Sequence, residues 1–406
     1  MATLVRRQFL SLAATGGAVL ALRSTPARAQ SGDPIKIGFP IPLTGPYGAE
    51  ARDQEDGAML AVDEINARGG VLGRRVELLV RDDQLKPGVG AQRAKELIEN
   101  EKVPLMSGAL SAAVQMAINE QTKKARVIYV SISQSNEITA RPDWSPYTFH
   151  EAINPHITSQ AVGSWALLNL GKRLYVLYAD YAFGHQLRDG FKLAAERHGG
   201  TFLGADPHPL GATDYSALFP RVQAAKPDVL VLANFGKDQL NSVKQAGSFG
   251  LKAQMKLVCP VFLGTVRREG GPDVFEGVYG GTTFYWELAE RIPSAKRFVE
   301  AFQKRYQRPP FDYAGYAYSG IRLLLEGVER AKSLDPDQVV ATLEGHRYDH
   351  YKGAQWIRKC DHQSFQDVYV IKSRAPQQGE WGLFEIVARV EGTQSLERTC
   401  KELGHA

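Results

Sequence analysis

Short apolar runs alternate with segments of helical periodicity along most of this chain, and this alternation constrains the fold more than any other feature. Runs of strand length occur at residues 35–41, 76–83, 103–108 and 127–133. Between them, apolar residues recur at helical spacing. Strands that alternate with helices in this way predict doubly wound, mostly parallel α/β sheets, whose ligands bind outside the carboxyl ends of the strands.

A second series of the same kind begins near residue 156. Its strand-length runs lie at 173–180, 201–209, 228–235 and 255–260. A further strand within 277–288 is expected to leave this series, followed by helices at 294–307 and 312–332. Two α/β lobes are therefore predicted. No low-complexity linker separates them, so the chain is expected to cross between the lobes directly, and such crossings can serve as hinges.

The segment "SGALSAA", residues 107–113, connects a predicted strand to a predicted helix through small residues only. One interpretation is a shelf for an anion, because the first backbone N–H groups of a helix have no partner within the helix and attract a carboxylate or phosphate. The other interpretation is that small residues let the helix and strand pack closely. This segment alone leaves both interpretations open.

The N-terminus has the features of a cleavable export signal. Arg6 and Arg7 precede a modest apolar run, and "ARA" at Ala27–Ala29 supplies a small-residue cleavage site near Ala29. The arginine pair resembles a twin-arginine signal. A membrane anchor is disfavoured because the run is short and broken by Gly16-Gly17.

Most of the net positive charge belongs to this predicted signal. Residues 1–29 carry four arginines and no acid, so the formal net charge of +5 falls to +1 without them. A nucleic-acid or anionic-membrane partner would need a basic patch in the remaining chain. The sequence therefore predicts neither partner. The export signal predicts a periplasmic location.

The sequence contains three cysteines, Cys259, Cys360 and Cys400, with no C-x-x-C pair that would indicate a metal or redox centre. An oxidising compartment permits one disulfide. Cys360 with Cys400 is favoured because both lie in the C-terminal part, although the sequence does not fix the pairing. No metal or cofactor is predicted.

Enzyme signatures are absent. The chain has no G-x-S-x-G nucleophile elbow and no G-x-x-x-x-G-K-[ST] phosphate loop. Asp180 and His185 could form an acid–base pair in an enzyme of another kind. The prediction is that the chain is not an enzyme.

Several motifs resemble the periplasmic solute-binding proteins of ABC importers, in the Leu/Ile/Val-binding branch. They are "IKIGFPIPLTGPYG", "GAMLAVDEINARGGVLGRRVELLVRDDQ", "SGALSAA", "VSISQSNEITAR", "YAFG" and "DVLVLANF" followed by "LNSVKQAGSFGLK". The resemblance implies a type I periplasmic binding fold, with two lobes joined by three crossovers that close over a small solute. It also implies permease subunits in the inner membrane as partners, and a monomer. The first lobe would comprise residues 34–154 plus 284–360, and the second 155–283 plus 361–406, with its last strand at 367–374.

Carried over by position, the resemblance assigns the ligand carboxylate to Ser111, through its hydroxyl and the backbone N–H groups beside it at Ala112. Ile132 and Gln134 fall where the family uses a backbone carbonyl and amide, and Ser133 is a substitute for the hydroxyl common at the latter position. The acid that pairs with the ligand ammonium in amino-acid binders falls at Val261. A valine cannot balance a buried cation, and an unpaired ammonium in a closed cleft costs several kcal/mol.

The matched aromatic positions favour a flat or apolar ligand, although each ring alone is as readily explained as core packing. They are Tyr47, Phe183, Phe235 with its neighbour Asn234, Tyr285 and Tyr316. A small carboxylate-bearing, aromatic solute without a free α-ammonium is predicted. The alternatives are a branched-chain amino acid or amide, and a ligand sensor that acts through a membrane partner.

The segment "CDH" at residues 360–362 lies in a C-terminal region that resembles a subgroup often binding aromatic acids. The alternative is that these three residues form a structural turn.

Overall fold

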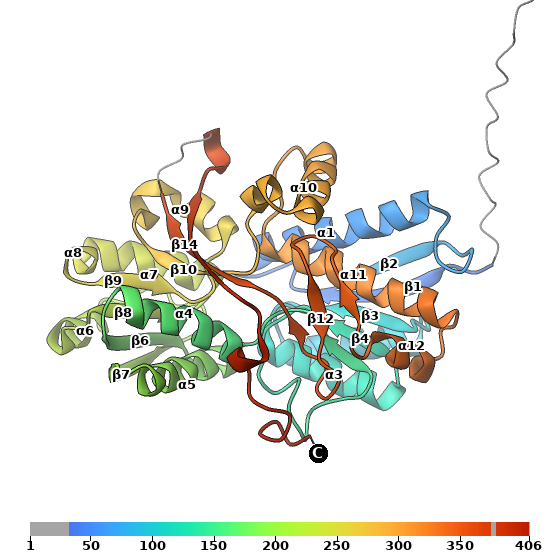
Figure 1. The fold of residues 1–406 in the computed structure, drawn as a ribbon, viewed down its shortest axis with the longest axis horizontal. Coiled ribbons are helices and arrows are strands. Elements are labelled where there is room, and N and C mark those ends of the chain that lie inside the picture. The colour runs from blue at the N-terminus through green and yellow to red at the C-terminus, as the bar shows by residue number, and fades with distance from the viewer. Residues whose placement is uncertain (1–31, 375–378, 406) are drawn as a thin grey trace, which may run out of the picture.

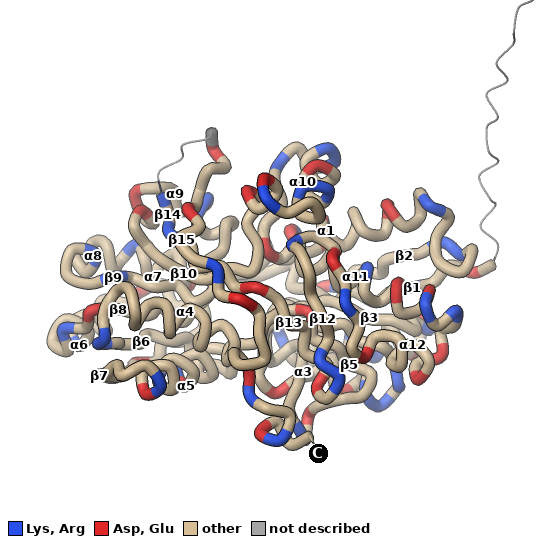
Figure 2. Tube along the Cα trace, viewed as in Figure 1, with Lys and Arg blue, Asp and Glu red and all other residues tan. Residues whose placement is uncertain are grey.

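The computed structural model describes residues 32–374 and 379–405, which fold into two α/β lobes lying side by side (Figure 1). The predicted export signal, residues 1–29, lies outside the described residues. In Figure 2, Lys and Arg are interspersed with Asp and Glu over both lobes in this view.

The first lobe is built on five parallel strands in the order β2-β1-β3-β4-β5. The strands are β1 (Ile35–Ile41), β2 (Val76–Asp82), β3 (Leu105–Gly108), β4 (Ile128–Ser131) and β5 (Thr148–His150). Its helices are α1 (Gly48–Ala67), α2 (Pro87–Glu99), α3 (Ala112–Ala125), α10 (Pro293–Tyr306), α11 (Asp312–Ala331) and α12 (Pro336–Leu343).

Both faces of this sheet are covered by helices. Successive side chains of a strand point to opposite faces, and β3 shows the result. Leu105 packs in the large apolar core that contains α1 and α11, whereas Met106 packs in a separate cluster with residues of α2 and α3. A strand buried on both faces is why this run reads as continuously apolar.

The second lobe is built on seven strands in the order β15-β14-β10-β9-β8-β6-β7. The strands are β6 (Arg173–Ala179), β7 (Thr201–His208), β8 (Val229–Ala233), β9 (Lys256–Cys259), β10 (Tyr279–Thr282), β14 (Val368–Ser373) and β15 (Phe384–Val390). Its helices are α4 (Pro155–Asn169), α5 (Ala182–Arg197), α6 (Phe219–Ala225), α7 (Gly236–Ser248), α8 (Leu251–Gln254) and α9 (Gly264–Phe275). All pairs are parallel except those made by β14. The mostly parallel α/β prediction is confirmed.

The structure adds elements that the sequence analysis did not anticipate. Beyond β14, which was expected to be the last strand, β15 extends the second sheet by an antiparallel edge. A small antiparallel sheet joins β11 (Arg347–Tyr348), β12 (Gln355–Ile357) and β13 (Ser364–Phe365). The strand expected within 277–288 is shorter, because the chain turns into the 3₁₀ helix η1 (Trp286–Glu290).

The end of the chain departs from the predicted division into lobes. Residues 391–405, here called the C-terminal strap, pass from β15 through η3 (Gln394–Leu396), which lies against α4. They then return to the first lobe, where the Arg141 N–H donates to the Leu403 carbonyl (2.9 Å). Cys400 forms a disulfide with Cys360, the pair favoured from the sequence. Residues 399–405, expected in the second lobe, therefore pack on the first.

Candidate functional site

Three chain segments run between the two large sheets and form the hinge region. They are residues 151–154 between β5 and α4, 283–285 between β10 and η1, and 366–367 between β13 and β14. Buried hydrogen bonds tie the first and third segments to each other and to the small sheet. The Gln355 side-chain amide donates to the Glu151 carboxylate (2.9 Å), and the Gln366 amide donates to the Glu151 carbonyl. Glu151 therefore links two of the three hinge segments.

Aromatic side chains from both lobes meet on the side of the hinge where the strands end. Tyr47, which precedes α1, packs edge-on against Phe235, which precedes α7, with ring centroids 4.8 Å apart. Phe235 also contacts Phe183 (6.3 Å) and Tyr313 (5.7 Å), and Tyr313 contacts Tyr316 (5.7 Å). Four of the five predicted aromatic positions are thus brought into one band, which Tyr313 completes.

A small cavity of about 10 Å³ lies within this region, between the lobes. That volume is close to the minimum for one water molecule. The lobes are therefore closed in this structure, and a larger solute requires the aromatic contacts to part. The lining residues are Gln134, Ile153, Thr158, Pro260, Val261, Gly281, Thr282, Thr283, Asp312, Tyr313, Tyr316 and Val368.

The shelf begins with a backbone conformation that its small residues permit. Gly108 has φ of +113°, and a Cβ there would lie 2.5 Å from the Pro40 carbonyl oxygen, so only glycine fits. Ser111 is the N-cap of α3. A serine here usually caps the helix with its hydroxyl, yet the Ser111 side chain makes no cap hydrogen bond. Its hydroxyl and the N–H groups of the first helical turn are left for another partner.

Two further polar side chains after β4 lack partners. The Ser133 hydroxyl and the Gln134 carbonyl oxygen are buried without a hydrogen bond to any described residue. An unpaired buried polar group costs about 1–3 kcal/mol. Gln134, but not Ser133, also lines the cavity.

Other predicted residues are committed to contacts within the protein. The Tyr285 hydroxyl donates to the Trp381 carbonyl (2.9 Å) and accepts the Leu383 N–H (2.9 Å). The Asn234 amide donates to Ser242 (3.0 Å) inside the second lobe. The Ile132 side chain is fully buried in the main core, and its backbone role in the site stays a prediction.

An acid that the sequence analysis missed lies in the cavity wall. Asp312 is the first residue of α11, 7% exposed, and the Thr282 hydroxyl is its only side-chain hydrogen-bond partner among the described residues. Burial raises the pKa of its carboxyl to about 7, against the Thr282 hydrogen bond, which lowers it. An acid in the first turn of a helix usually serves the helix dipole, so nothing in the local pattern around Asp312 points to the hinge. Val261 lines the same cavity from the second lobe.

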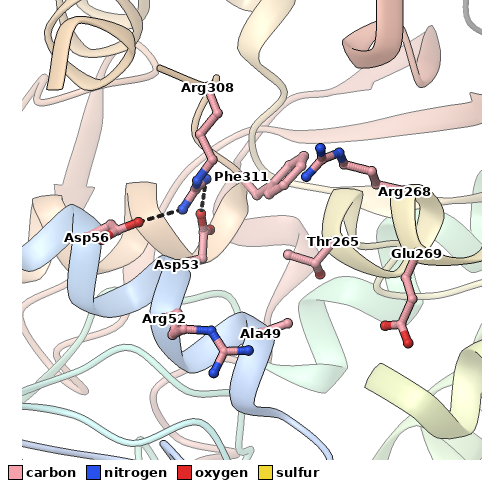
Figure 3. Close-up of a pocket in the computed structure, with 9 residues that line it drawn as sticks. All are labelled: Ala49, Arg52, Asp53, Asp56, Thr265, Arg268, Glu269, Arg308 and Phe311. Atoms are coloured by element: carbon pink, nitrogen blue, oxygen red, sulfur yellow. Dashed lines mark hydrogen bonds and ion pairs between the residues drawn. The ribbon is translucent and has the colours of Figure 1, made fainter. Parts of the chain in front are cut away.

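At the outer edge of the cleft, a pocket of about 530 Å³ lies between α1 and α9 (Figure 3). The Thr265 hydroxyl donates across it to the Glu50 carboxylate (2.7 Å), and burial raises the pKa of Glu50. Figure 3 shows Arg308 directed at both Asp53 and Asp56, at 2.9 and 2.7 Å. The Thr265–Glu50 hydrogen bond joins the two lobes at the mouth of the cleft, whereas the Arg308 ion pairs join α1 to the segment between α10 and α11 within the first lobe.

Phe311 crosses the same boundary. Its ring approaches that of Trp381 (6.0 Å between centroids), which follows the second sheet's β14 in the chain. It also lies directly over Gly264, the first residue of α9, where a Cβ would meet the ring at 2.2 Å. The absence of a side chain at Gly264 therefore lets the lobes close this far.

The residues considered above as an acid–base pair, Asp180 and His185, and as a ligand-related motif, residues 360–362, have structural contacts. His185 and Asp180 pair at 2.7 Å, with exposed side chains. Asp361 is held by Arg358 (2.6 Å), and the His362 ring stacks on Phe149 at 4.2 Å. Together with the Cys360 disulfide, these contacts make residues 360–362 a structural turn.

Within residues 32–374 and 379–405, no group of three or more His, Cys, Asp or Glu side chains is placed to hold a metal ion. In the same part of the chain, no helix combines the length and apolar character needed to cross a membrane.

Comparison with known proteins identifies relatives of the same architecture. The chain is 26% identical over 315 residues to Leu/Ile/Val-binding protein homolog 3 of Brucella melitensis biotype 1, covering 76% of this chain and 82% of the relative. A periplasmic binding protein from Burkholderia mallei has 26% identity and a TM-score of 0.84, covering 91% and 98% of the two chains.

A third comparison is a likeness of fold alone. The solute-binding protein of an ABC transporter from Rhodopseudomonas palustris BisB5, solved in complex with 3,4-dihydroxybenzoic acid, has 24% identity and a TM-score of 0.79. The match covers 88% of this chain and 97% of that one.

A family profile described as periplasmic binding protein matches residues 34–379, most of the chain. The relatives are binding proteins, and the chain is a binding protein rather than an enzyme. The two-lobed type I fold, the cleft between its lobes and this match agree: the chain belongs to the periplasmic binding protein family.

Proposed function

We propose that this chain is the periplasmic solute-binding component of an ABC importer, and that it closes on a small carboxylate-bearing aromatic solute. The observation that carries the proposal is the meeting of aromatic rings from both lobes beside buried polar groups without partners. Rings supply apolar contact area, and a few convergent polar groups fix orientation. Its partners would be permease subunits of the inner membrane, and the chain would act as a monomer.

The carboxylate would bind at the shelf. The Ser111 hydroxyl, the first N–H groups of α3 beside Ala112 and the Ser133 hydroxyl are donors with no acceptor among the described residues. Hydrogen bonds from such donors to a charged acceptor are stronger than those between neutral groups. The relative with bound 3,4-dihydroxybenzoic acid has the same fold, which supports an aromatic acid here by analogy.

A branched-chain amino acid is the second candidate, and Asp312 is the observation in its favour, because a carboxylate in the cavity wall is a possible partner for an ammonium. The two candidates make different demands on that wall. An amino acid needs three acceptors for its ammonium, whereas an aromatic acid needs apolar surface.

A thermal-shift and calorimetric screen tests the proposal. We expect benzoate- or cinnamate-like acids to stabilise the protein, by about 2.7 kcal/mol at 100 times the dissociation constant. Ser111→Ala should weaken binding by roughly 1–3 kcal/mol. The half-buried Ser216, which lies outside the cleft, provides a matched Ser216→Ala control. Stabilisation by leucine or valine with none by the aromatic acids would contradict the proposed ligand class.

A further inference from the structure

Asp312 lines the cavity, but as an acid it has no role in binding the carboxylate of the proposed solute. We propose that Asp312 selects solutes that carry one hydroxyl donor besides the carboxylate, as in a hydroxy-substituted aromatic acid. This inference rests on the proposed function, because it names the second polar group of the same solute.

The Asp312 carboxyl is fixed on one side and available on the other. Oδ1 is hydrogen bonded to the Thr282 hydroxyl, which also lies 2.7 Å from the Phe284 carbonyl oxygen and accepts the Phe284 N–H (3.1 Å). No side chain among the described residues donates to Oδ2, and the residue's own backbone N–H is the one backbone group that stabilises the carboxylate. Asp312 lines the cavity although the side chain is more than nine-tenths buried. A solute in the closed cleft therefore meets one free carboxyl oxygen.

Several other polar groups of the cavity wall already have partners, although the Gln134 carbonyl oxygen does not. The Thr283 hydroxyl donates to the Tyr316 hydroxyl (2.7 Å), and the Thr158 hydroxyl donates to the Asn154 carbonyl (3.0 Å). The Val261 carbonyl accepts from the Gln239 amide (2.9 Å). What remains around the free oxygen is largely apolar.

This arrangement fits one donor better than three. A hydroxyl brings a single O–H, which the free Asp312 oxygen accepts. An ammonium brings three N–H groups, and those without an acceptor in a closed apolar site weaken binding.

Aromatic rings lie on the same cavity wall as Asp312. Tyr313, the next residue, and Tyr316, one helical turn on, lie in the same cavity wall. A hydroxyl attached to a flat ring therefore reaches Asp312 while the ring lies against aromatic surface. A hydroxyl on a flexible chain would lose more rotational freedom on binding.

Calorimetric titration of the full exported chain with four probes tests the inference: benzoate, 3-hydroxybenzoate, 4-hydroxybenzoate and 4-(aminomethyl)benzoate. We expect one hydroxybenzoate to bind at least about tenfold more tightly than benzoate, and the ammonium probe to bind more weakly than that hydroxybenzoate. Asp312→Asn should reduce the hydroxyl preference to within about threefold while benzoate binding persists. Asp189→Asn, a change at an exposed acid of α5, should leave the preference unaltered.

The outcomes separate the inference from the proposed function. If benzoate and both hydroxybenzoates bind equally, the inference is overturned and the aromatic-acid function stands. Tightest binding of the ammonium probe overturns it as well, in favour of an amine. If none of the four probes binds, both fail. The wild-type series decides these cases even if Asp312→Asn does not fold, and Thr282→Val, which releases Oδ1, should also reduce the preference.

Discussion

Adding one methyl group at Gly264 should oppose closure without opposing folding. Gly264 opens α9 of the second lobe, and a Cβ there would lie 2.2 Å from the ring of Phe311, which precedes α11 of the first lobe. Ordinary contact begins at about 3.4 Å, so the ring or the lobe must move by roughly 1 Å. In an open form the two residues separate and the clash disappears.

The size of the effect follows from this geometry. Overpacking a close contact costs about 1–3 kcal/mol, and this cost falls on the closed form alone. Solute affinity should therefore fall by about 5- to 150-fold. The free energy of unfolding without solute should be unchanged or slightly higher, because alanine favours a helix over glycine by about 1 kcal/mol.

Gly264→Ala and a matched control can be compared by calorimetry with whichever aromatic acid binds. Gly247→Ala in α7 makes the same change in a helix, where the new Cβ would meet only the end of Lys252 at 3.6 Å. Only the first variant should lose affinity, and denaturant titration should show both folded. Wild-type affinity in Gly264→Ala would refute the reasoning that these lobes close onto each other at Phe311.

Three further changes test the contacts that support the cleft. Arg308→Ala should lower the free energy of unfolding by about 3–5 kcal/mol at pH 7, because it leaves the buried Asp53 carboxylate without its cation. Cys360→Ser should lower it by about 2–4 kcal/mol by removing a disulfide that spans 40 residues. For Asp312, burial raises the carboxyl pKa from 3.8 to about 7, so the folded chain holds a proton that the unfolded chain has lost. This contribution to stability is therefore lost as pH rises from about 4 to 7, and Asp312→Asn should stabilise the protein more at pH 8 than at pH 4.

Each of these has a control in denaturant unfolding. Arg126→Ala breaks an exposed ion pair and should cost less than about 1 kcal/mol; an equal loss in both variants would contradict the Arg308 argument. Reductant should destabilise the wild type but not Cys360→Ser, and a wild type indifferent to reductant would count against the disulfide. An Asp312→Asn effect that is the same at both pH values would show that the carboxyl does not titrate differently on folding.

The sequence was most informative where a pattern repeats. The two large sheets follow from apolar runs of strand length, because strands covered by helices on both faces must be apolar throughout. The strands of the small sheet β11–β13 have only two or three residues, too few to show a period. β15 does show the alternation of a half-buried edge strand, and the prediction ended one strand too early.

The site residues that could be predicted from the sequence are those next to the ends of strands. Tyr47, Phe235 and Gln134 follow or precede strand ends, and strand ends of a doubly wound fold converge on the cleft. Tyr285 also lies near a strand end, but its hydroxyl is engaged by the Trp381 carbonyl, a contact between residues 96 positions apart. Asp312 was missed for the same reason, since its environment is made by the hinge and not by its neighbours in sequence.

Because the ring of Trp381 lies near Phe311 of the other lobe, its fluorescence should report the opening of the cleft. The Arg268 guanidinium lies over the same indole at 4.1 Å, so opening the mouth of the cleft exposes one face of Trp381 to water and shifts its emission to longer wavelength. The remaining tryptophans, at positions 144, 165, 286 and 356, have their ring partners within one lobe or at the hinge and strap. Replacing those four with phenylalanine would leave Trp381 as the single tryptophan, and its emission, excited selectively at about 295 nm, would report the rate of closure without an attached dye.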